Sequence, residues 1–211
     1  DVEYKYKKQS GGHGQYGHVK MTFEPSGDMD TPYVFEQTVV GGAVPKNFFP
    51  AVEKGIAESV KKGPLAAYPV TGIKAVLYDG SYHPVDSSEM AFKVATQQAF
   101  KKGIMEAKPV LLEPIATLKV VVPEGYTGDV MGELNKRRAR VMGMNPTDNG
   151  YQEIVADIPY LELYGYNATL RSMTSGSGTF SCEFARYEQA PDDVAAKQIE
   201  ERASKLVEVE E

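Results

Sequence analysis

The sequence predicts an α+β fold arranged in two domains, and three observations support this. Strand-like alternation flanks a glycine-rich stretch near the N-terminus, and two stretches with helical periodicity follow it. The second half has the predicted order β-α-β-β-α-β, which is the split ferredoxin-like arrangement. The length of 211 residues suits one large domain or two small ones. We therefore expect domains at 1–110 and 111–190, followed by an acidic tail at 191–211 that forms a loosely packed helix over 192–209.

The first domain should open with a long hairpin over residues 2–22. Tyr4 and Tyr6 alternate with lysines before the glycines, and apolar residues alternate again after them. A third strand is expected over 33–40, closed by two glycines. A helix is expected over 47–62, because apolar residues recur there every four positions and form one stripe.

A strand, a loop and a second helix should complete the first domain. Residues rich in β-formers predict the strand over 70–78, and the loop follows over 79–84. The helix is expected over 87–102, with its end at Gly103. Asp86 stands three residues before a glutamate, which is the spacing of a capping box, so we expect Asp86 to cap this helix.

The second domain should contain four strands and two helices. Runs rich in valine, leucine and aromatic residues predict the strands at 114–122, 140–144, 151–158 and 179–187. Helical patterns predict the helices at 127–138 and 160–173. Cys182 is in phase with Phe180 and Phe184 on the last strand, so we expect all three to face inward, with the cysteine as a small buried hydrophobe.

The composition excludes several classes of protein. Hydrophobic residues make up 42% and charged residues 25%, which excludes wholesale disorder. No apolar run approaches the ~18 residues that a membrane-spanning helix needs. One cysteine permits no intrachain disulfide. The chain begins Asp-Val-Glu, without a methionine or the features of a signal peptide, which indicates a piece of a longer or processed protein.

The net charge of −6 does not favour a bulk electrostatic grip on nucleic acid. The acidity is concentrated, however, because residues 191–211 carry 3 basic and 7 acidic residues whereas residues 1–110 carry 13 and 12. Phosphate binding depends on where the cations lie, so local contacts with RNA are compatible with this composition.

All three histidines lie in two segments predicted as loops: His13 and His18 among the glycines, and His83 in the loop before the second helix. Two interpretations of the glycine-rich segment are open. It can be a hairpin tip that needs positive φ angles, or a backbone that approaches RNA or phosphate closely with its N–H donors. The glutamine, tyrosine and histidine side chains between the glycines suit stacking and hydrogen bonding against single-stranded RNA.

Other sites are less well supported by the residues. The three histidines with Asp79 or Asp86 would be needed for a small metal-dependent hydrolase, but their spacing matches no metal motif, so we expect no metal.

The run 136–138 fits either a solvated helix end that suits the helix dipole or an RNA-phosphate contact through Arg137 and Arg138. No Gly-Lys dipeptide occurs, so the sequence has no P-loop and we expect no enzyme activity and no cofactor in this segment.

Several motifs are spread over the chain. The glycine-rich segment reads KQSGG followed by GQYGHV, and the segment before the second helix reads GSYH with VDSSEMAFK. With these motifs, nearly the whole chain, to about Pro191, resembles translation elongation factor G, in which the two segments are similar to the glycine-rich loop and to the second tip loop with its helix. Further motifs lie at 107–114, which resembles the junction of the family's fourth and fifth domains, and at 128–130, 165–166 and 170–172, which are similar to motifs of the fifth domain.

The resemblance implies the fourth and fifth domains of that factor, an S5-domain-2-like α+β domain followed by a ferredoxin-like domain. It implies that the fourth domain promotes translocation by reaching into the decoding site, where its tip loops, near 9–18 and 79–86, touch the tRNA–mRNA duplex. The fifth domain would lie against large-subunit ribosomal RNA. With the two arginines of the basic run, the expected RNA-contacting residues are Gln9, Ser10, Gly11, Gly12, His13, Gly14, Gln15, Tyr16, Gly17, His18, Ser81, Tyr82, His83, Pro84, Arg137 and Arg138.

The resemblance also implies a larger parent. Its preceding domains would bind GTP and Mg²⁺ and make it a GTPase, and we expect a cytoplasmic monomer that binds the ribosome and no membrane. His13 stands where the family usually has arginine, Pro84 where it has an acid, and Ser177 where an arginine is common. These departures indicate a divergent paralogue, for which recycling, ribosome rescue and ribosomal protection are alternative functions.

Overall fold

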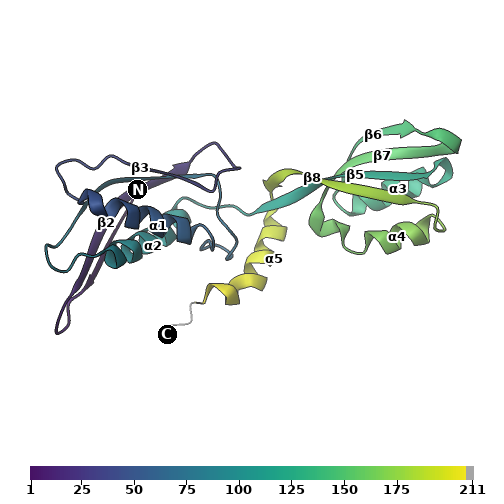
Figure 1. The fold of residues 1–211 in the computed structure, drawn as a ribbon. Helices are drawn as coiled ribbons and strands as arrows, with labels where there is room; N and C mark the ends of the chain where they lie inside the picture. The colour runs from purple at the N-terminus through teal and green to yellow at the C-terminus, as the bar shows by residue number, and fades with distance from the viewer. Residues whose placement is uncertain (208–211) are drawn as a thin grey trace. The chain divides into compact units, whose positions relative to one another are not determined.

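The structure, a computed structural model, describes residues 1–207 and divides into two compact units (Figure 1). The first unit comprises Asp1–Pro109 together with the chain from Asp193 onward, and the second comprises Val110–Asp192. In the described part of the chain, no helix is both long enough and apolar enough to cross a membrane.

A four-stranded sheet forms the base of the first unit, in the order β1-β2-β4-β3. Its strands are β1 (Val2–Lys8), β2 (Gln15–Pro25), β3 (Tyr33–Gln37) and β4 (Ile73–Ser81). The pairs β1–β2 and β2–β4 are antiparallel, whereas β3 runs parallel to β4. The expected long hairpin is therefore confirmed, and β1 and β2, purple in Figure 1, project at one end of this unit.

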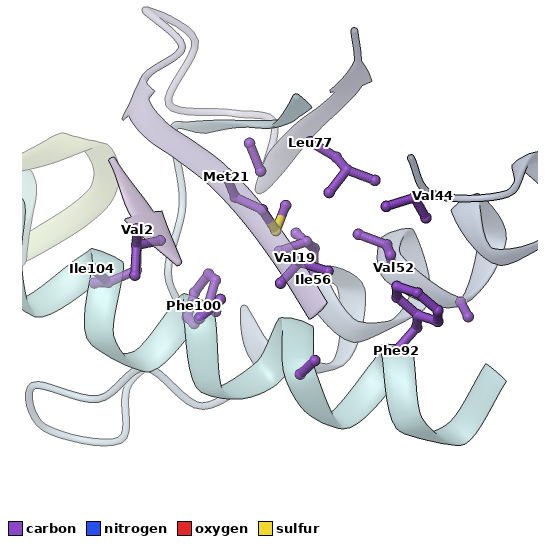
Figure 2. Packing of buried hydrophobic residues seen from close by; sticks show 14 of the residues in the cluster. Val2, Val19, Met21, Val44, Val52, Ile56, Leu77, Phe92, Phe100 and Ile104 are labelled. Carbon is purple, nitrogen blue, oxygen red and sulfur yellow. The ribbon is translucent and has the colours of Figure 1, made fainter. Parts of the chain in front are cut away.

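Two helices pack against this sheet, α1 (Phe49–Ser59) and α2 (Glu89–Glu106), and the short 3₁₀ helix η1 (Lys46–Phe48) precedes α1. Figure 2 shows the apolar core between the helices and the sheet. Most of the core residues occupy strand and helix positions, as the periodicity predicted, while Val44 and Val60 lie just outside these elements. Both layers contribute buried side chains to this core, including Val19, Met21, Leu77, Val52, Ile56, Phe92 and Phe100.

The predicted end of α2 at Gly103 is wrong, because the helix continues through this glycine to Glu106. Gly103 is buried, and a Cβ at this position would lie 2.5 Å from the ring of Phe23 on β2. The glycine therefore permits a close approach of helix and sheet rather than ending the helix.

The second unit has the sheet order β6-β7-β5-β8, and all three of its strand pairs are antiparallel. Its elements follow the expected β-α-β-β-α-β order, which confirms the ferredoxin-like prediction. They are β5 (Leu112–Pro123), α3 (Thr127–Lys136), β6 (Arg140–Pro146), β7 (Tyr151–Pro159), α4 (Tyr166–Met173) and β8 (Thr179–Gln189), with short 3₁₀ helices η2 (Glu124–Tyr126), η3 (Asp148–Gly150) and η4 (Tyr160–Leu163).

Two expectations for the second unit are wrong. The helix predicted over 160–173 is interrupted, because Gly165 adopts a left-handed conformation with φ 72° between η4 and α4. Cys182 and Phe184 are exposed rather than buried, and of the three in-phase residues only Phe180 packs against the core. The reason is topological: β8 is an edge strand with a neighbouring strand on one side only, so its side chains have fewer neighbours than those of a central strand.

The acidic tail forms α5 (Asp192–Arg202) and the 3₁₀ helix η5 (Ala203–Leu206). Contrary to the expected loose helix, it docks on the first unit. The Arg202 guanidinium donates to the carbonyl oxygens of Ala66 (2.6 Å) and Ala67 (3.0 Å) and lies 3.7 Å from the ring centre of Tyr68. Residues 208 and 209 of the predicted helix lie outside the described residues.

Candidate nucleic-acid interface

The two segments predicted as tip loops meet at one end of the first unit's sheet. The last pair of the β1–β2 hairpin joins Lys8 to Gln15, so residues 9–14 form its turn. The Tyr16 N–H donates to the Asp86 carbonyl oxygen (2.9 Å), and the Ser87 hydroxyl donates to the Tyr16 carbonyl oxygen (2.9 Å). The fold thus joins two loops that are about seventy residues apart in the chain into one surface, which we call the tip (residues 9–18 and 81–87).

Asp86 holds the two loops of the tip together. One carboxylate oxygen accepts a hydrogen bond from the Gly14 N–H (3.2 Å), and the other accepts one from the Gln9 side-chain amide (3.2 Å). A Cβ on Gly14 would lie 2.8 Å from the same carboxylate, so a glycine is needed there. The carboxylate is only 13% exposed, which suits a structural link rather than a free acid.

The prediction that Asp86 is the N-cap of α2 is therefore wrong. Ser88 is the cap, since it has an extended backbone and its hydroxyl accepts from the Ala91 N–H at 3.1 Å. The chain has Asp, Ser and Ser in the three positions before the helix, and the capping-box spacing to Glu89 selected the first of them, whereas the helix begins two residues later than that spacing implies.

His83 lies in the second loop with a fixed ring orientation. Its Nδ1 accepts hydrogen bonds from the backbone N–H groups of Val85 (3.2 Å) and Asp86 (3.0 Å). An imidazole nitrogen that accepts carries no proton, so this network assigns the proton of the neutral ring to Nε2. The side chain is 43% exposed, and its ring centre lies 6.3 Å from that of Tyr16.

His18 differs from the other two histidines, because it lies in β2 and is only 6% exposed. Its Nδ1 is 2.7 Å from the Ser81 hydroxyl, and its Nε2 is 2.6 Å from the Glu3 carboxylate. The hydrogen bond from His18 is the main reason why the pKa of Glu3 lies below its usual value. Both ring nitrogens of His18 are thus engaged inside the protein, and Gly17 beside it is buried against the backbone of α2.

The remaining predicted residues of the tip present polar groups to solvent. Gly11 and Gly12 have positive φ angles of 52° and 143°, as a tight hairpin turn requires. Half-buried positions of the tip are Gly14, Tyr16, Ser81, His83, Asp86 and Ser87. The exposed side chains are Gln9, Ser10, His13, Gln15, Tyr82 and Pro84.

Three lysines that were not among the predicted RNA-contacting residues lead to the tip along β1. Lys5, Lys7 and Lys8 are exposed, and in the strand register they lie opposite His18, Tyr16 and Gln15. For Lys5 and Lys7 the alternation of lysine with tyrosine was the available signal, because it places both on the outward side of a strand next to the glycine-rich loop, whereas Lys8 follows Lys7 directly and lies on the opposite side.

Arg137 and Arg138 are held by partners inside the second unit. Arg137 donates to the Glu133 carboxylate (2.8 Å) and to the carbonyl oxygens of Glu162 (2.6 Å) and Tyr164 (3.0 Å). Arg138 forms a two-point ion pair with Glu113 (2.9 and 3.0 Å), which raises the pKa of its guanidinium, and also pairs with Glu162. A contact of these arginines with RNA phosphate stays a prediction, while their visible role is to hold the segment around η4.

The three histidines do not form a ligand set. Within residues 1–207, no group of three or more His, Cys, Asp or Glu side chains is arranged to hold a metal ion. The interface is thus a surface of amides, hydroxyls, imidazoles and backbone N–H groups, with nearby lysines. Such a surface can make local hydrogen bonds and stacking contacts with RNA.

Comparison with protein families matches the two halves of the chain to consecutive domains. Residues 1–108 match the model of elongation factor G domain IV, and residues 110–198 match that of the elongation factor G C-terminus. The chain belongs to the elongation factor G family. It is 50% identical over 209 residues to an elongation factor G-like protein of Thermotoga maritima, and the match covers 99% of this chain and 30% of that protein.

A solved structure supports the same assignment. A crystal structure of a Thermus thermophilus protein is 44% identical, with a TM-score of 0.81, and the match covers 96% of this chain and 30% of that one. The chain therefore spans about a third of the length of these relatives. The family predicted from the motifs is confirmed, and the sequence corresponds to elongation factor G domain IV and the C-terminal domain that follows.

Proposed function

We propose that this segment of an elongation factor G-like protein binds the ribosome and that its tip enters the decoding site, contacts the tRNA–mRNA duplex and promotes translocation. The observation that supports the proposal most strongly is the joining of the two family loops through Asp86 and Ser87 into one surface. A contact surface that is already ordered before binding has little conformational entropy to lose when it meets RNA.

The charge of the first domain fits this role. The tip presents mostly neutral hydrogen-bonding groups, and the exposed lysines nearest to it are Lys5, Lys7 and Lys8 of β1, whereas Lys20 of β2 is paired with Asp79. Contacts of this kind position a protein on RNA, whereas a uniformly basic surface would mainly increase non-specific binding.

The same proposal assigns the GTPase reaction to other domains of the longer protein. The two matched domains account for residues 1–108 and 110–198, and the sequence has no P-loop. GTP and Mg²⁺ would be bound outside this segment, and the segment itself would act as a binding and positioning module in the cytoplasm.

The substitution His83→Ala in the full-length protein tests the role of the tip. It removes the exposed imidazole together with its Nδ1 acceptor, so we expect single-turnover translocation to slow by roughly tenfold, which corresponds to ~1.4 kcal/mol of transition-state stabilisation. Ribosome binding, measured in parallel, should change by less than about twofold, because the many other contacts remain.

Val85→Ala is the matched control, since Val85 lies in the same loop, is 67% exposed and contributes only its backbone to the His83 network. Equal translocation rates for the wild-type and His83→Ala proteins would remove His83 from the mechanism. A normal translocation rate with a defect only in a subunit-splitting assay would instead assign the segment to ribosome recycling.

A further inference from the structure

A chain of four hydrogen-bonded side chains, three of them in the tip, ends at a carboxylate on β1. It begins at Tyr16, whose hydroxyl lies 2.6 Å from the Ser81 hydroxyl. Ser81 is 2.7 Å from Nδ1 of His18, and Nε2 of His18 is 2.6 Å from the Glu3 carboxylate. The chain therefore links a half-buried tyrosine of the tip, through a buried histidine, to a carboxylate on β1.

The proton positions in this chain follow from its two ends. Glu3 is an exposed carboxylate with a lowered pKa, so at neutral pH it is ionised and can only accept. Nε2 of His18 must then carry a proton. In the neutral ring Nδ1 has none and accepts from the Ser81 hydroxyl.

The same donor-to-acceptor direction extends to the Tyr16 end of the chain. Ser81 has one hydroxyl proton, and it donates that proton to Nδ1 of His18. The short contact between Ser81 and Tyr16 must therefore be made by the Tyr16 hydroxyl proton. The hydroxyl of Tyr16 consequently points its proton inward, and only its lone pairs remain for a ligand.

We propose that His18 is a positioning residue of the RNA-contacting tip, whose neutral form fixes the Tyr16 hydroxyl as a hydrogen-bond acceptor for a ribose 2′-hydroxyl or an exocyclic amine of RNA. This inference rests on the proposed function for the identity of the ligand. The direction of the hydrogen bonds rests on the contacts of the chain together with the ionised carboxylate of the exposed Glu3.

Protonation of His18 reverses the donor and acceptor roles in the hydrogen bonds between His18, Ser81 and Tyr16. Both ring nitrogens then donate, so Ser81 accepts from Nδ1 and its own proton is directed to Tyr16. The Tyr16 proton is displaced outward, and the tyrosine becomes a donor. No heavy atom has to move for this change, because every contact in the chain is already within hydrogen-bonding distance.

The charged groups around His18 are balanced. Glu3 and Lys5 face it from β1, Lys20 follows it on β2, and Asp79 faces it from β4, where Lys20 and Asp79 form an ion pair of 3.3 Å. Two cations and two anions thus surround the ring. The partner with a direct hydrogen bond, Glu3, is the charged group that selects between the two neutral forms of His18.

The first test is ¹⁵N NMR of the histidine side chains in the 211-residue chain, followed as a function of pH. In the neutral form of His18 we expect the proton on Nε2. In Glu3→Gln, whose amide can either accept or donate, we expect a mixture of the two neutral forms. A wild-type His18 with its proton on Nδ1 would overturn the proposed direction of the chain.

The second test measures translocation by the full-length protein with Tyr16→Phe. At a pH where NMR shows His18 neutral, we expect the loss of one acceptor to slow translocation about fivefold, equivalent to ~1 kcal/mol. This penalty should fall below about twofold as His18 becomes protonated. Comparing Tyr16→Phe with wild type at each pH cancels the effects of other titrating groups on the ribosome.

Ser81→Ala is the control, since it cuts the chain between His18 and Tyr16 but leaves the Glu3 pair intact. In this background the effect of Tyr16→Phe should be independent of pH. A wild-type penalty that is the same at every pH would refute the positioning role. If His83→Ala and Tyr16→Phe both leave translocation unchanged, the proposed function and the RNA contact fail together, whereas the NMR result still decides the direction of the chain.

Discussion

At the scale of single residues, Asp86 shows how one side chain can be assigned two different roles. Its position before α2 predicted a helix cap, but its carboxylate joins Gly14 and Gln9 of the other loop. Ser88, two residues later, makes the cap. The two roles are separable because they stabilise different parts of the first domain.

Substitution of the two residues by alanine should therefore have different consequences. Ser88→Ala should lower the free energy of unfolding by about 1 kcal/mol, because it removes an N-cap. Asp86→Ala should speed amide hydrogen exchange at Gly14, whose N–H loses its acceptor. Denaturant unfolding and hydrogen exchange measured on both variants test this. Normal exchange at Gly14 in Asp86→Ala would contradict the link between the loops.

Tyr166 is the second residue whose environment makes a specific prediction. It is fully buried in the second unit, and within the described residues its hydroxyl is the only buried side-chain N or O atom without a hydrogen-bond partner. Burial raises the pKa of Tyr166 to about 12, and Phe180 packs against its ring at 5.1 Å.

Tyr166→Phe should raise the free energy of unfolding by up to about 1 kcal/mol, because it removes a desolvated polar atom and breaks no hydrogen bond. Tyr16→Phe is the matched control, since its hydroxyl has a partner and its loss should lower stability by a similar amount. Denaturant unfolding measures both. A stability loss in Tyr166→Phe would show that the hydroxyl has a partner in solution.

At the scale of elements, the glycines decide where helices pack and where they end. Gly103 lies within α2 beside Phe23, while Gly165, at the N-cap position of α4, separates this helix from η4 with a left-handed backbone. The sequence pattern predicted the reverse, a helix that ends at Gly103 and another that continues through Gly165. The difference arises because one glycine is used for its small size and the other for its positive φ.

Gly103→Ala should lower the free energy of unfolding by roughly 1–3 kcal/mol, since the new methyl group would overlap the Phe23 ring at 2.5 Å. Gly132→Ala in α3 is the control. A methyl group on Gly132 would have no neighbouring atom within 4 Å, so alanine should stabilise the helix by up to about 1 kcal/mol. Equal effects of the two substitutions in urea unfolding would contradict the packing role of Gly103.

At the scale of the whole molecule, the chain forms two separate cores and returns to the first unit after completing the second. The tail helix α5 is attached there through Arg202, and the Tyr68 hydroxyl donates to Gln198 on the same helix (2.9 Å). Asp192, Asp193, Glu200 and Glu201 of the tail are exposed, while Arg202 makes the contacts with the carbonyl oxygens of the first unit.

Arg202→Ala should weaken the first unit and leave the second unchanged. It removes two charge-assisted hydrogen bonds and the stacking on Tyr68, so we expect a loss of roughly 1–3 kcal/mol. Hydrogen exchange resolved by residue measures the two cores separately. Lys205→Ala, in η5, is the control and should be neutral. Equal loss of protection in both cores would contradict the local role of the tail.

The sequence by itself determined the order and type of most elements, the two-domain α+β fold and the family. Alternation and helical periodicity are local properties, so they can be recognised before the chain is folded. The family motifs are similarly written in consecutive residues. They also located the tip loops and the exposed glutamine and histidine side chains of the glycine-rich turn.

Only the tertiary structure decided which residues of the candidate site are buried and which partners they have. The links of Asp86 with Gly14, of His18 with Ser81, and of Arg138 with Glu113 join residues 72, 63 and 25 positions apart. Likewise, the exposure of Cys182 depends on its strand being at the sheet edge. A local pattern shows which face a residue prefers, whereas a hydrogen bond between distant segments exists only after folding has brought them together.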